Sequence, residues 1–459
     1  MFRLMRWDWR LLVRSGLIQA LLGGWLLLLI AATAFGYQQS AEHRSAIHDV
    51  LEDAQLKQRK LEHEIQAGEL IASMPLSANA TLSLAPGALM DIVAGRSDLE
   101  PVSAEVNMWT LTHLMFLNHQ TSNAQTLALG RFDLGFVTLY LLPLMIIVLG
   151  YSMLTEERTS GLERMLKAHG VSMNRLLLAR TSSRGLLVVV PLLLAIVSMY
   201  WLSPTLHAER GERLLALVVV VLIYASFWLC LTSWVNARAR TDGQALQQLC
   251  AVWVVLAMLL PAAIGAWARV AYPAPSRLDL LATARRVEID ATQQRERLLG
   301  AYTHDHPNLV VKDAATTPLW QKGVIVVTGA VEAAVAPVRD RFDAQLLKQQ
   351  RLTEQLQFLS PTLIAQQTLT RISGTDESRY AAVRWQAGNY LYELRQVIGR
   401  MAMAGEPLTV ERLRSLPKFV QADPLLGTTL RAVAWPLGLL CAVSLVLAGF
   451  SRVRLEDQR

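Results

Sequence analysis

Six stretches of the chain carry no charged side chain for 20 residues or more, and they constrain the fold more than any other feature. They run from Ser15 to Ala41, Leu134 to Thr155, Gly185 to Ala208, Leu214 to Ala237, Gly243 to Ala268 and Ala432 to Ser451. Each can cross a hydrocarbon core of about 30 Å, because a helix rises about 1.5 Å per residue. One such stretch alone could be a buried core helix. Six of them in a chain of 459 residues, only 18% of which are charged, predict a membrane protein.

The first stretch also resembles a signal peptide, since basic residues precede it and the small residues Ala32, Thr33 and Ala34 lie near its end. Its apolar core is longer than that of a usual signal peptide, and five further stretches follow it. We therefore expect an uncleaved first span.

Lysine and arginine in the short connections indicate the orientation of these spans. With a cytoplasmic N-terminus, the inner segments are 1–14, 156–184, 238–242 and 452–459, and they hold 15 basic and 7 acidic residues. The rest of the chain holds 29 basic and 30 acidic residues. The net charge of +7 therefore arises on the cytoplasmic side. It argues for membrane orientation and against nucleic acid as a partner.

These features predict an all-α polytopic membrane protein with six transmembrane helices and a mainly helical exoplasmic domain built from two loops. The first residues place Phe2, Met5, Trp9 and Leu12 at helical spacing between arginines, as in an amphipathic helix at the membrane interface, although an ordinary basic N-terminal region has the same composition. The expected order is an interfacial helix at 1–15, spans at 16–37, 133–154, 185–206, 213–236, 247–269 and 431–451, exoplasmic loops at 38–132 and 270–430, a cytoplasmic coupling segment at 155–184, a cytoplasmic loop at 237–246 and a cytoplasmic tail at 452–459.

Apolar residues at helical spacing predict the helices of the outer domain. In the first loop, a helix from Ser40 to Leu70 continues out of the membrane. In the second loop, helices are expected over Arg277–Tyr302, from Val331 or Pro337 to Phe358, and over 361–372, 378–404 and 410–416. The short run 323–328 fits either a strand or a helix.

A transporter needs an energy source, and the sequence contains neither a phosphate-binding G-x-x-x-x-G-K-[ST] loop nor a charged residue in the middle of a span. If the protein performs driven work, the drive comes from a partner. We expect no enzymatic activity in this chain, because no set of catalytic residues has a spacing that sequence can certify. An intramembrane protease or transferase is a weaker alternative.

The segment 156–184 has the features of a docking helix. Leu162, Met165 and Leu166 form an apolar stripe at i, i+3 and i+4, and Glu163, Arg164 and Lys167 surround it. Thr159 or Ser160 could cap the start of the helix, and Gly170 could end it. A solvated or headgroup-bound loop helix would have the same composition, so the residues alone leave both interpretations open.

Several motifs resemble ABC-2 type transporter permeases. The motifs around the second span are Phe132-Asp133-Leu134-Gly135-Phe136-Val137, Tyr140-Leu-Leu-Pro143, Gly150-Tyr151 and Glu156-Glu157-Arg158-Thr159-Ser160-Gly161. Further motifs resemble a subgroup with two large exoplasmic loops, related to permeases of gliding motility and nitrous-oxide-reductase maturation: Tyr272-Pro273-x-Pro275-Ser276-Arg277, Asp305-His306-Pro307, Phe358-Leu359-Ser360-Pro361, Gly374-Thr375-Asp376 and Gly405-Glu406-Pro407-Leu408-Thr409. The resemblance extends from about residue 10 to 455.

The resemblance implies a permease of the bacterial cytoplasmic (inner) membrane with both termini in the cytoplasm. It would dimerise with itself or with a paralogous permease above two copies of an ABC ATPase. ATP and magnesium would bind to the ATPase subunits, so no cofactor is expected in this chain, and a periplasmic partner would bind the outer domain. The residues implied in ATPase coupling are Glu156, Glu157, Gly161, Leu162, Met165 and Leu166. Many relatives have a proline after the coupling glycine, where this chain reads Met165-Leu-Lys-Ala-His-Gly-Val-Ser172, so the resemblance does not fix the end of the coupling helix.

His304 and His306 flank Asp305 and could be metal ligands, but Pro307 marks a helix end and favours a capping and turn role, so we expect no metal site. The alternative function is a membrane scaffold or anchor, in which the exoplasmic helical domain binds an envelope partner without transport. The sequence singles out no substrate.

Overall fold

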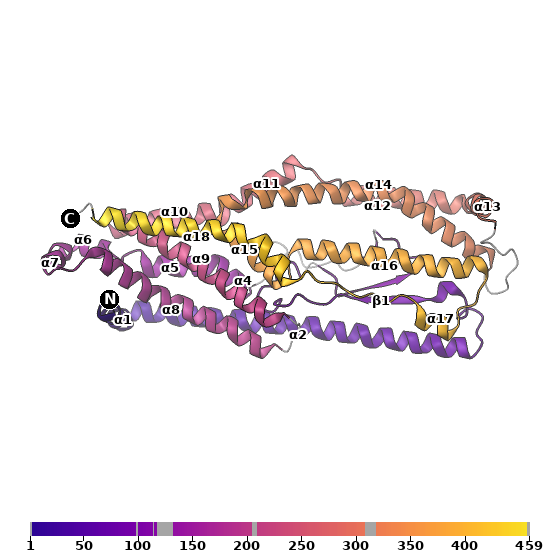
Figure 1. Cartoon of the computed structure of the whole chain (residues 1–459), viewed down its shortest axis with the longest axis horizontal. Coiled ribbons are helices and arrows are strands. Elements are labelled where there is room, and N and C mark those ends of the chain that lie inside the picture. Colours follow the sequence, from indigo (N-terminus) through magenta and orange to yellow (C-terminus); the bar gives the residue numbers. More distant parts are fainter. Residues whose placement is uncertain are drawn as a thin grey trace.

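The computed structural model describes residues 2–97, 100–112, 114–116, 132–203, 209–307 and 318–456. Most of the described helices run along the length of an elongated molecule (Figure 1). Parts of the predicted segments lie outside the described residues: 1 of the interfacial helix, 98–99, 113 and 117–131 of the first outer loop, 204–206 of the third span, 308–317 of the second outer loop, and 457–459 of the tail.

Seven of the described helical segments are long and apolar enough to cross a membrane. They are Gly16–Gln66, Leu134–Thr159, Met173–Leu202, Arg210–Arg238, Asp242–Ala271, Leu319–Leu359 and Leu426–Arg452. Six of them contain or overlap the six uncharged stretches of the sequence. The other, Leu319–Leu359, has a mean hydropathy of 1.3 against 2.0 to 2.8 for the rest. The chain is therefore a multi-pass membrane protein built almost entirely of helices.

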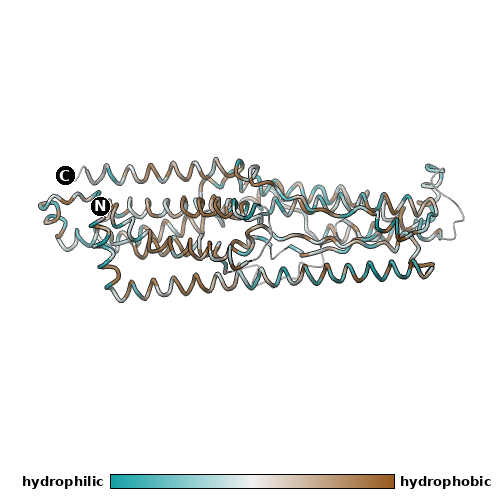
Figure 2. Tube along the Cα trace, turned by 60° about the horizontal axis from the view of Figure 1, so that its bottom comes forward, coloured by the Kyte–Doolittle hydropathy of each residue, from teal (hydrophilic) through white to brown (hydrophobic). Residues whose placement is uncertain are grey.

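The half of the molecule that holds both termini is a bundle of apolar helices (Figures 1 and 2). Its elements are α1 (Phe2–Arg14), the first part of α2 (Gly16–Gln66), α4 (Leu134–Phe136), the π-helical turn η3 (Val137–Leu141), α5 (Leu142–Gly150), α6 (Thr155–Thr159), α7 (Leu162–Ala168), α8 (Met173–Leu202), α9 (Arg210–Arg238), α10 (Asp242–Trp253), the π-helical turn η4 (Val254–Leu259), α11 (Leu260–Ala271) and α18 (Leu426–Glu456). Its core includes Trp25, Leu142, Val188, Tyr224 and Trp228, which come from four of these helices.

Two prolines disturb the helical hydrogen bonding in the bundle, and a hydroxyl group from another element compensates at each place. Pro143 has no N–H for the carbonyl of Leu139, four residues earlier, and the buried Tyr224 hydroxyl donates to that oxygen at 2.8 Å. Pro261 follows η4, and the Ser360 hydroxyl donates to the carbonyl of Leu256, five residues earlier, at 2.6 Å. In lipid, every backbone polar group must find a partner, so these contacts permit the bends.

The other half of the molecule is richer in hydrophilic residues (Figure 2). It contains the second part of α2 and η1 (Pro75–Ser77), β1 (Asn79–Ser83), β2 (Ser103–Asn107), α12 (Arg277–Gln293), α13 (Arg295–Asp305), α14 (Leu319–Leu356), η5 (Gln357–Leu359), α16 (Glu377–Ala404) and α17 (Val410–Ser415), and α15 (Pro361–Ser373) connects it to the bundle. Its main core joins Leu82 and Val106 of the first predicted loop to Leu391 and Ile398 of the second. The two predicted loops thus form one packed unit, which we call the outer unit.

Two local features of this half differ from our expectations, and one alternative that the sequence left open is decided. β1 and β2 form an antiparallel pair, from Asn79 opposite Asn107 to Ser83 opposite Ser103, that the sequence analysis did not predict. The run 323–328 is helical, and α14 begins at Leu319, before both starting points that we expected. The helix continues through Pro337 because Val331 and Val335 bury their side chains against α12.

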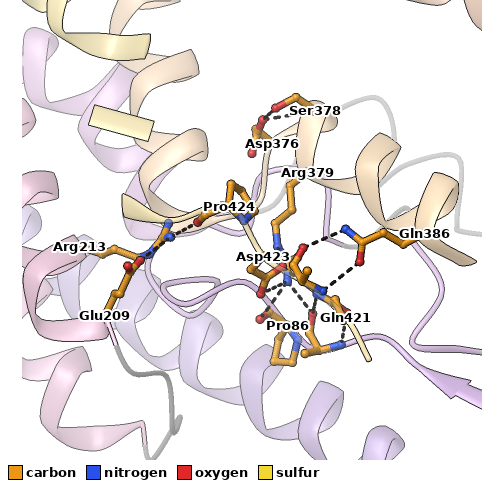
Figure 3. A network of polar contacts seen from close by, with 12 residues as sticks. Pro86, Glu209, Arg213, Asp376, Ser378, Arg379, Gln386, Gln421, Asp423 and Pro424 are labelled. Carbon is orange, nitrogen blue, oxygen red and sulfur yellow. Dashed lines mark hydrogen bonds and ion pairs between the residues drawn. The ribbon is translucent and has the colours of Figure 1, made fainter. Parts of the chain in front are cut away.

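A buried arginine connects the segments of the two loops (Figure 3). Arg379, which is 3% exposed, donates to both carboxylate oxygens of Asp423 at 2.8 and 3.0 Å and to the carbonyl of Ala85 at 2.9 Å. This bidentate geometry fixes the planar guanidinium group in one orientation. Arg379 thereby holds segments of the two predicted loops together, at the part of their packed unit that we call its base.

A second set of arginines connects this base to α9. Arg213 donates to Glu209 at 2.9 Å and to the carbonyl of Pro424 at 2.6 Å (Figure 3). One turn earlier, Arg210 forms an ion pair of 2.6 Å with Asp91, which is 3% exposed. Movement of α9 would therefore be transmitted to both loops of the outer unit.

Candidate functional site

The predicted coupling segment forms a small lobe at the end of the molecule that holds both termini (Figure 1). It consists of α6 and α7, and Gly161 separates the two helices with a φ of 74°. The lobe ends at Gly170, whose φ is 75°. Residues 173–184, which we assigned to the coupling segment, are instead the first three turns of α8.

The two ends of α7 differ from each other in how well the sequence predicted them. The expected cap by Thr159 or Ser160 was wrong: Gly161 is the N-cap, and the two hydroxyls bond to carbonyls of α6 instead. Gly170 does end the helix. The amide of Val171 donates to the carbonyl of Leu166 at 3.0 Å and that of Gly170 to Lys167 at 2.9 Å, which is a Schellman motif.

The predicted apolar stripe of the lobe divides into an exposed part and a buried part. Leu162 and Met165 are 42% and 58% exposed, whereas Leu166 packs against a small core that contains Met153 and Met173. Leu166 thus packs the lobe against the bundle, whereas the side chains of Leu162 and Met165 are exposed.

The two glutamates of the motif also have different environments. Glu156 is exposed. Glu157 is 5% exposed and forms an ion pair with Arg180 of α8. Among the coupling residues that we predicted, Glu156, Gly161, Leu162 and Met165 are therefore accessible, while Glu157 and Leu166 fasten the lobe.

Glu157 belongs to a buried cluster that we call the basal ion cluster, made of Asp8, Glu157, Arg180, Ser183 and Arg184. Asp8 of α1 is 2% exposed and lies 3.5 Å from Arg180 and 3.7 Å from Arg184, and it accepts a hydrogen bond from Ser183. Two carboxylates thus balance two guanidinium groups. Such mutual compensation is what allows charges to be buried at the end of a helix bundle.

The arginines of this cluster also bind the backbone of the second span. Arg180 donates to the carbonyl of Met153 at 2.5 Å, and Arg184 donates to that of Leu149 at 2.5 Å. Leu149 lies in the last turn of α5, where the helix leaves its last acceptors without an intrahelical donor, and Met153 lies in the turn that follows. The cluster therefore joins α1, α5, α6 and α8.

A second clamp holds the lobe to α9. Arg158 donates to the carbonyls of Asn236, Ala237 and Ala239 at 2.9, 3.2 and 2.6 Å. Its positive charge also suits the negative end of the α9 dipole. Arg158 lies 3.5 Å from Glu163 of α7 as well, so one side chain connects both parts of the lobe to the end of α9.

Five residues hold this site together that we did not predict from the sequence: Asp8, Arg158, Arg180, Arg184 and Asn236. Asn236 donates to the carbonyls of Gly150 and Thr232 at 2.9 Å and accepts from the amide of Leu154 at 3.4 Å. Arg158 was visible inside the quoted motif. The others gave no local signal, because each has at least one partner in a segment remote in sequence.

The histidines that were considered as metal ligands lie at the far end of the molecule from the lobe, at the end of α13. His304 lies 3.3 Å from Asp305, and the ring of His306 stacks on Tyr302 with centroids 4.5 Å apart. No group of three or more histidine, cysteine, aspartate or glutamate side chains in the described ranges could hold a metal ion.

Comparison with known proteins adds one result. A family model described as a domain of unknown function (DUF3526) matches residues 277–421, which include most of the outer unit that comes from the second loop. No curated protein and no solved structure matches the chain.

Proposed function

We propose that this chain is the transmembrane permease subunit of an ABC-2 type ATP-binding cassette transporter. In this proposal a partner ATPase binds the α6–α7 lobe, and ATP hydrolysis drives substrate export or conformational work on the exoplasmic side. The observation that carries the proposal is the construction of the lobe. It exposes Leu162 and Met165, while the buried Glu157 and the half-buried Arg158 fasten it to the ends of several spans.

A lobe of this kind suits force transmission for a mechanical reason. A force on exposed side chains moves a bundle only if the connection to the bundle is stiff. Here the connection consists of buried ion pairs and of hydrogen bonds to backbone carbonyls, on three different helices. The same helices reach the outer unit, where Arg213 and Arg210 of α9 bind segments of both loops. Motion at the lobe has a continuous path to the opposite end.

We infer six spans and not seven. α14 contains Lys322 and Glu332, packs along α12 and α13, and lies in the hydrophilic half (Figures 1 and 2). Both termini lie at one end of the molecule, as an even number of crossings requires. The excess of basic residues in the segments at this end favours a cytoplasmic location for both termini, in the bacterial inner membrane.

The permease would work as a dimer, with a second copy or a paralogous permease, and the outer unit would face the periplasm. A membrane scaffold without transport is the second candidate. The exposed Trp385 and Tyr392 favour it, because they lie seven residues apart on one face of α16 and could contact an envelope partner.

Purification of the tagged chain from native membranes, with identification of every subunit, tests the proposal. An ATP-binding cassette subunit in stable stoichiometry is the expected result. Its absence under mild solubilisation would exclude both ATP-driven versions. Substrate flux in vesicles containing the complex would then distinguish transport from mechanical work.

A further inference from the structure

A groove lies between α9 and α18 near the end of the bundle that holds both termini. The two helices pack along one another, and the groove between them has a volume of about 360 Å3. The residues that line it are Trp234, Arg238, Ala442, Val443, Val446, Leu447 and Phe450.

The groove combines apolar walls with a single cation. Val443, Val446 and Phe450 are 41%, 54% and 57% exposed, so the outer wall faces the surroundings of the protein. Arg238 is the one charged side chain among the lining residues. Its guanidinium carbon lies 4.1 Å from the centroid of the Trp234 ring. The aromatic ring holds the cation in place but does not neutralise its charge.

Arg238 has no carboxylate partner within the described part of the chain. Two more exposed arginines, Arg240 and Arg452, lie close by in sequence but do not line the groove, so contact with a ligand in the groove falls to Arg238. An anionic ligand is therefore favoured there.

The position of this cation along the helix defines the class of ligand. Arg238 is the last residue of α9, and Trp234 lies one turn earlier, after an uncharged stretch that begins at Leu214. A tryptophan followed by an arginine at the end of a span is typical of the headgroup level of a membrane. The apolar part of the groove runs from there toward the hydrocarbon core.

We propose that this groove binds an anionic phospholipid, with its phosphate on Arg238 and one acyl chain along Val443 and Val446. A transmembrane helix of a partner fits less well. Close helix contacts in membranes use small residues, whereas bulky exposed side chains form this wall. A flexible acyl chain adapts to such a surface, and the planar guanidinium group suits a phosphate.

The site has a consequence for the lobe, which rests on the proposed function. Arg158 of the lobe binds the carbonyls of Asn236, Ala237 and Ala239, the residues that surround Arg238. A lipid on Arg238 would hold the end of α9 in the conformation that these carbonyls require. Anionic lipid would then increase the coupling of the ATPase to the permease.

Native mass spectrometry of the purified full-length chain, without any ATPase, tests the binding site independently of the proposed function. The protein is titrated with phosphatidylglycerol and, separately, with phosphatidylcholine of the same acyl chains. We expect the wild type to retain phosphatidylglycerol in preference. Arg238→Ala should weaken its binding about fivefold, the factor that one arginine near an anionic surface supplies.

Arg240→Ala is the matched control, because it removes the same charge two residues later without lining the groove, and its binding should stay close to that of the wild type. Val446→Trp fills the groove and keeps Arg238, so it should also weaken retention and serves if Arg238→Ala does not fold. Equal retention of the two lipids by the wild type overturns the proposal. So does full retention by Arg238→Ala or by Val446→Trp.

Discussion

Glu157 of the α6–α7 lobe and Arg180 of α8 form an ion pair in which the two residues are only 5% and 4% exposed. Through this pair, the segment that contains Glu156 and Glu157 is attached to the helix bundle. The glutamate follows directly after the exposed Glu156, so two neighbouring carboxylates have opposite roles. One faces the surroundings, while the other determines how the lobe sits on the spans.

Replacement of Glu157 by glutamine should destabilise the protein by about 3 kcal/mol. The change keeps the size of the side chain but leaves Arg180 with less compensation in a buried setting, which is the costly way to break an ion pair. Thermal unfolding of the purified chain in detergent measures the effect. Glu156→Gln is the matched control and should change stability by no more than about 0.5 kcal/mol, because that side chain is exposed. Equal effects of the two substitutions would contradict the role assigned to the pair.

The glycine between α6 and α7 gives a second prediction. Gly161 has a φ of 74°, and a Cβ atom at this position would meet no atom within 4 Å. The cost of Gly161→Ala is therefore conformational only, about 1 kcal/mol. We expect amide hydrogen exchange in α7 to accelerate about fivefold, since that free energy favours local opening by this factor.

Gly300→Ala is the control for Gly161→Ala. It lies inside α13 and also has open space around its Cβ position, so alanine should slow exchange in α13. Unchanged exchange in α7 of the Gly161→Ala protein would show that the left-handed conformation is not required there.

The pair between Asp91 and Arg210 at the base of the outer unit predicts a dependence on pH. Burial raises the pKa of the Asp91 carboxyl group above its ordinary value of 3.8, and Arg210 opposes this shift without cancelling it. The folded protein thus binds the proton more tightly than the unfolded chain. The stability that Asp91 contributes is fully present below its ordinary pKa and is lost as the pH rises through the raised value.

Asp91→Asn removes this titration. The free energy of unfolding of the wild type, minus that of the variant, should therefore fall as the pH rises from the ordinary pKa of an aspartate, 3.8, through the raised pKa of Asp91. Thermal unfolding of both proteins across this range measures the difference, in which other titrating groups cancel. A difference that stays constant or rises with pH would contradict the effect of burial.

The sequence was sufficient where the signal is local. Uncharged stretches predicted the helices of the bundle, and helical spacing predicted the outer part of α2 and the helix at Pro361–Ser373. It failed where the partner is remote. From the sequence, Arg180 and Arg184 were assigned to a cytoplasmic loop. In the structure they are buried residues of α8, and nothing near them in sequence indicates that Asp8 and Glu157 compensate their charges.

The same reason explains the errors in the outer unit and in the lobe. The strands β1 and β2 are stable only through their pairing with each other and their packing on α16, and neither contact is visible in one short segment. Spacing placed Leu162, Met165 and Leu166 on one stripe but could not tell which of them faces the bundle. That choice depends on Met153 and Met173.

The division of that stripe gives the prediction that bears most directly on function. Leu162→Asp and Met165→Asp should each reduce ATPase activity coupled to the permease about tenfold or more, because exposed apolar anchors dominate the energy of an interface. Both side chains point away from the bundle, so the fold should survive. The activity of the purified complex, with co-purification of its ATPase subunit, measures the effect.

Two controls separate docking from folding in this experiment. Leu278→Asp changes a leucine that is 75% exposed on α12, at a distance from the lobe, and should leave coupling intact. Leu166→Asp places a charge in the small core under the lobe and should lower stability as well as coupling. Normal co-purification and activity of the Leu162→Asp and Met165→Asp proteins would exclude the lobe as the ATPase contact, since an interface built on these two exposed side chains could not tolerate a charge at either of them.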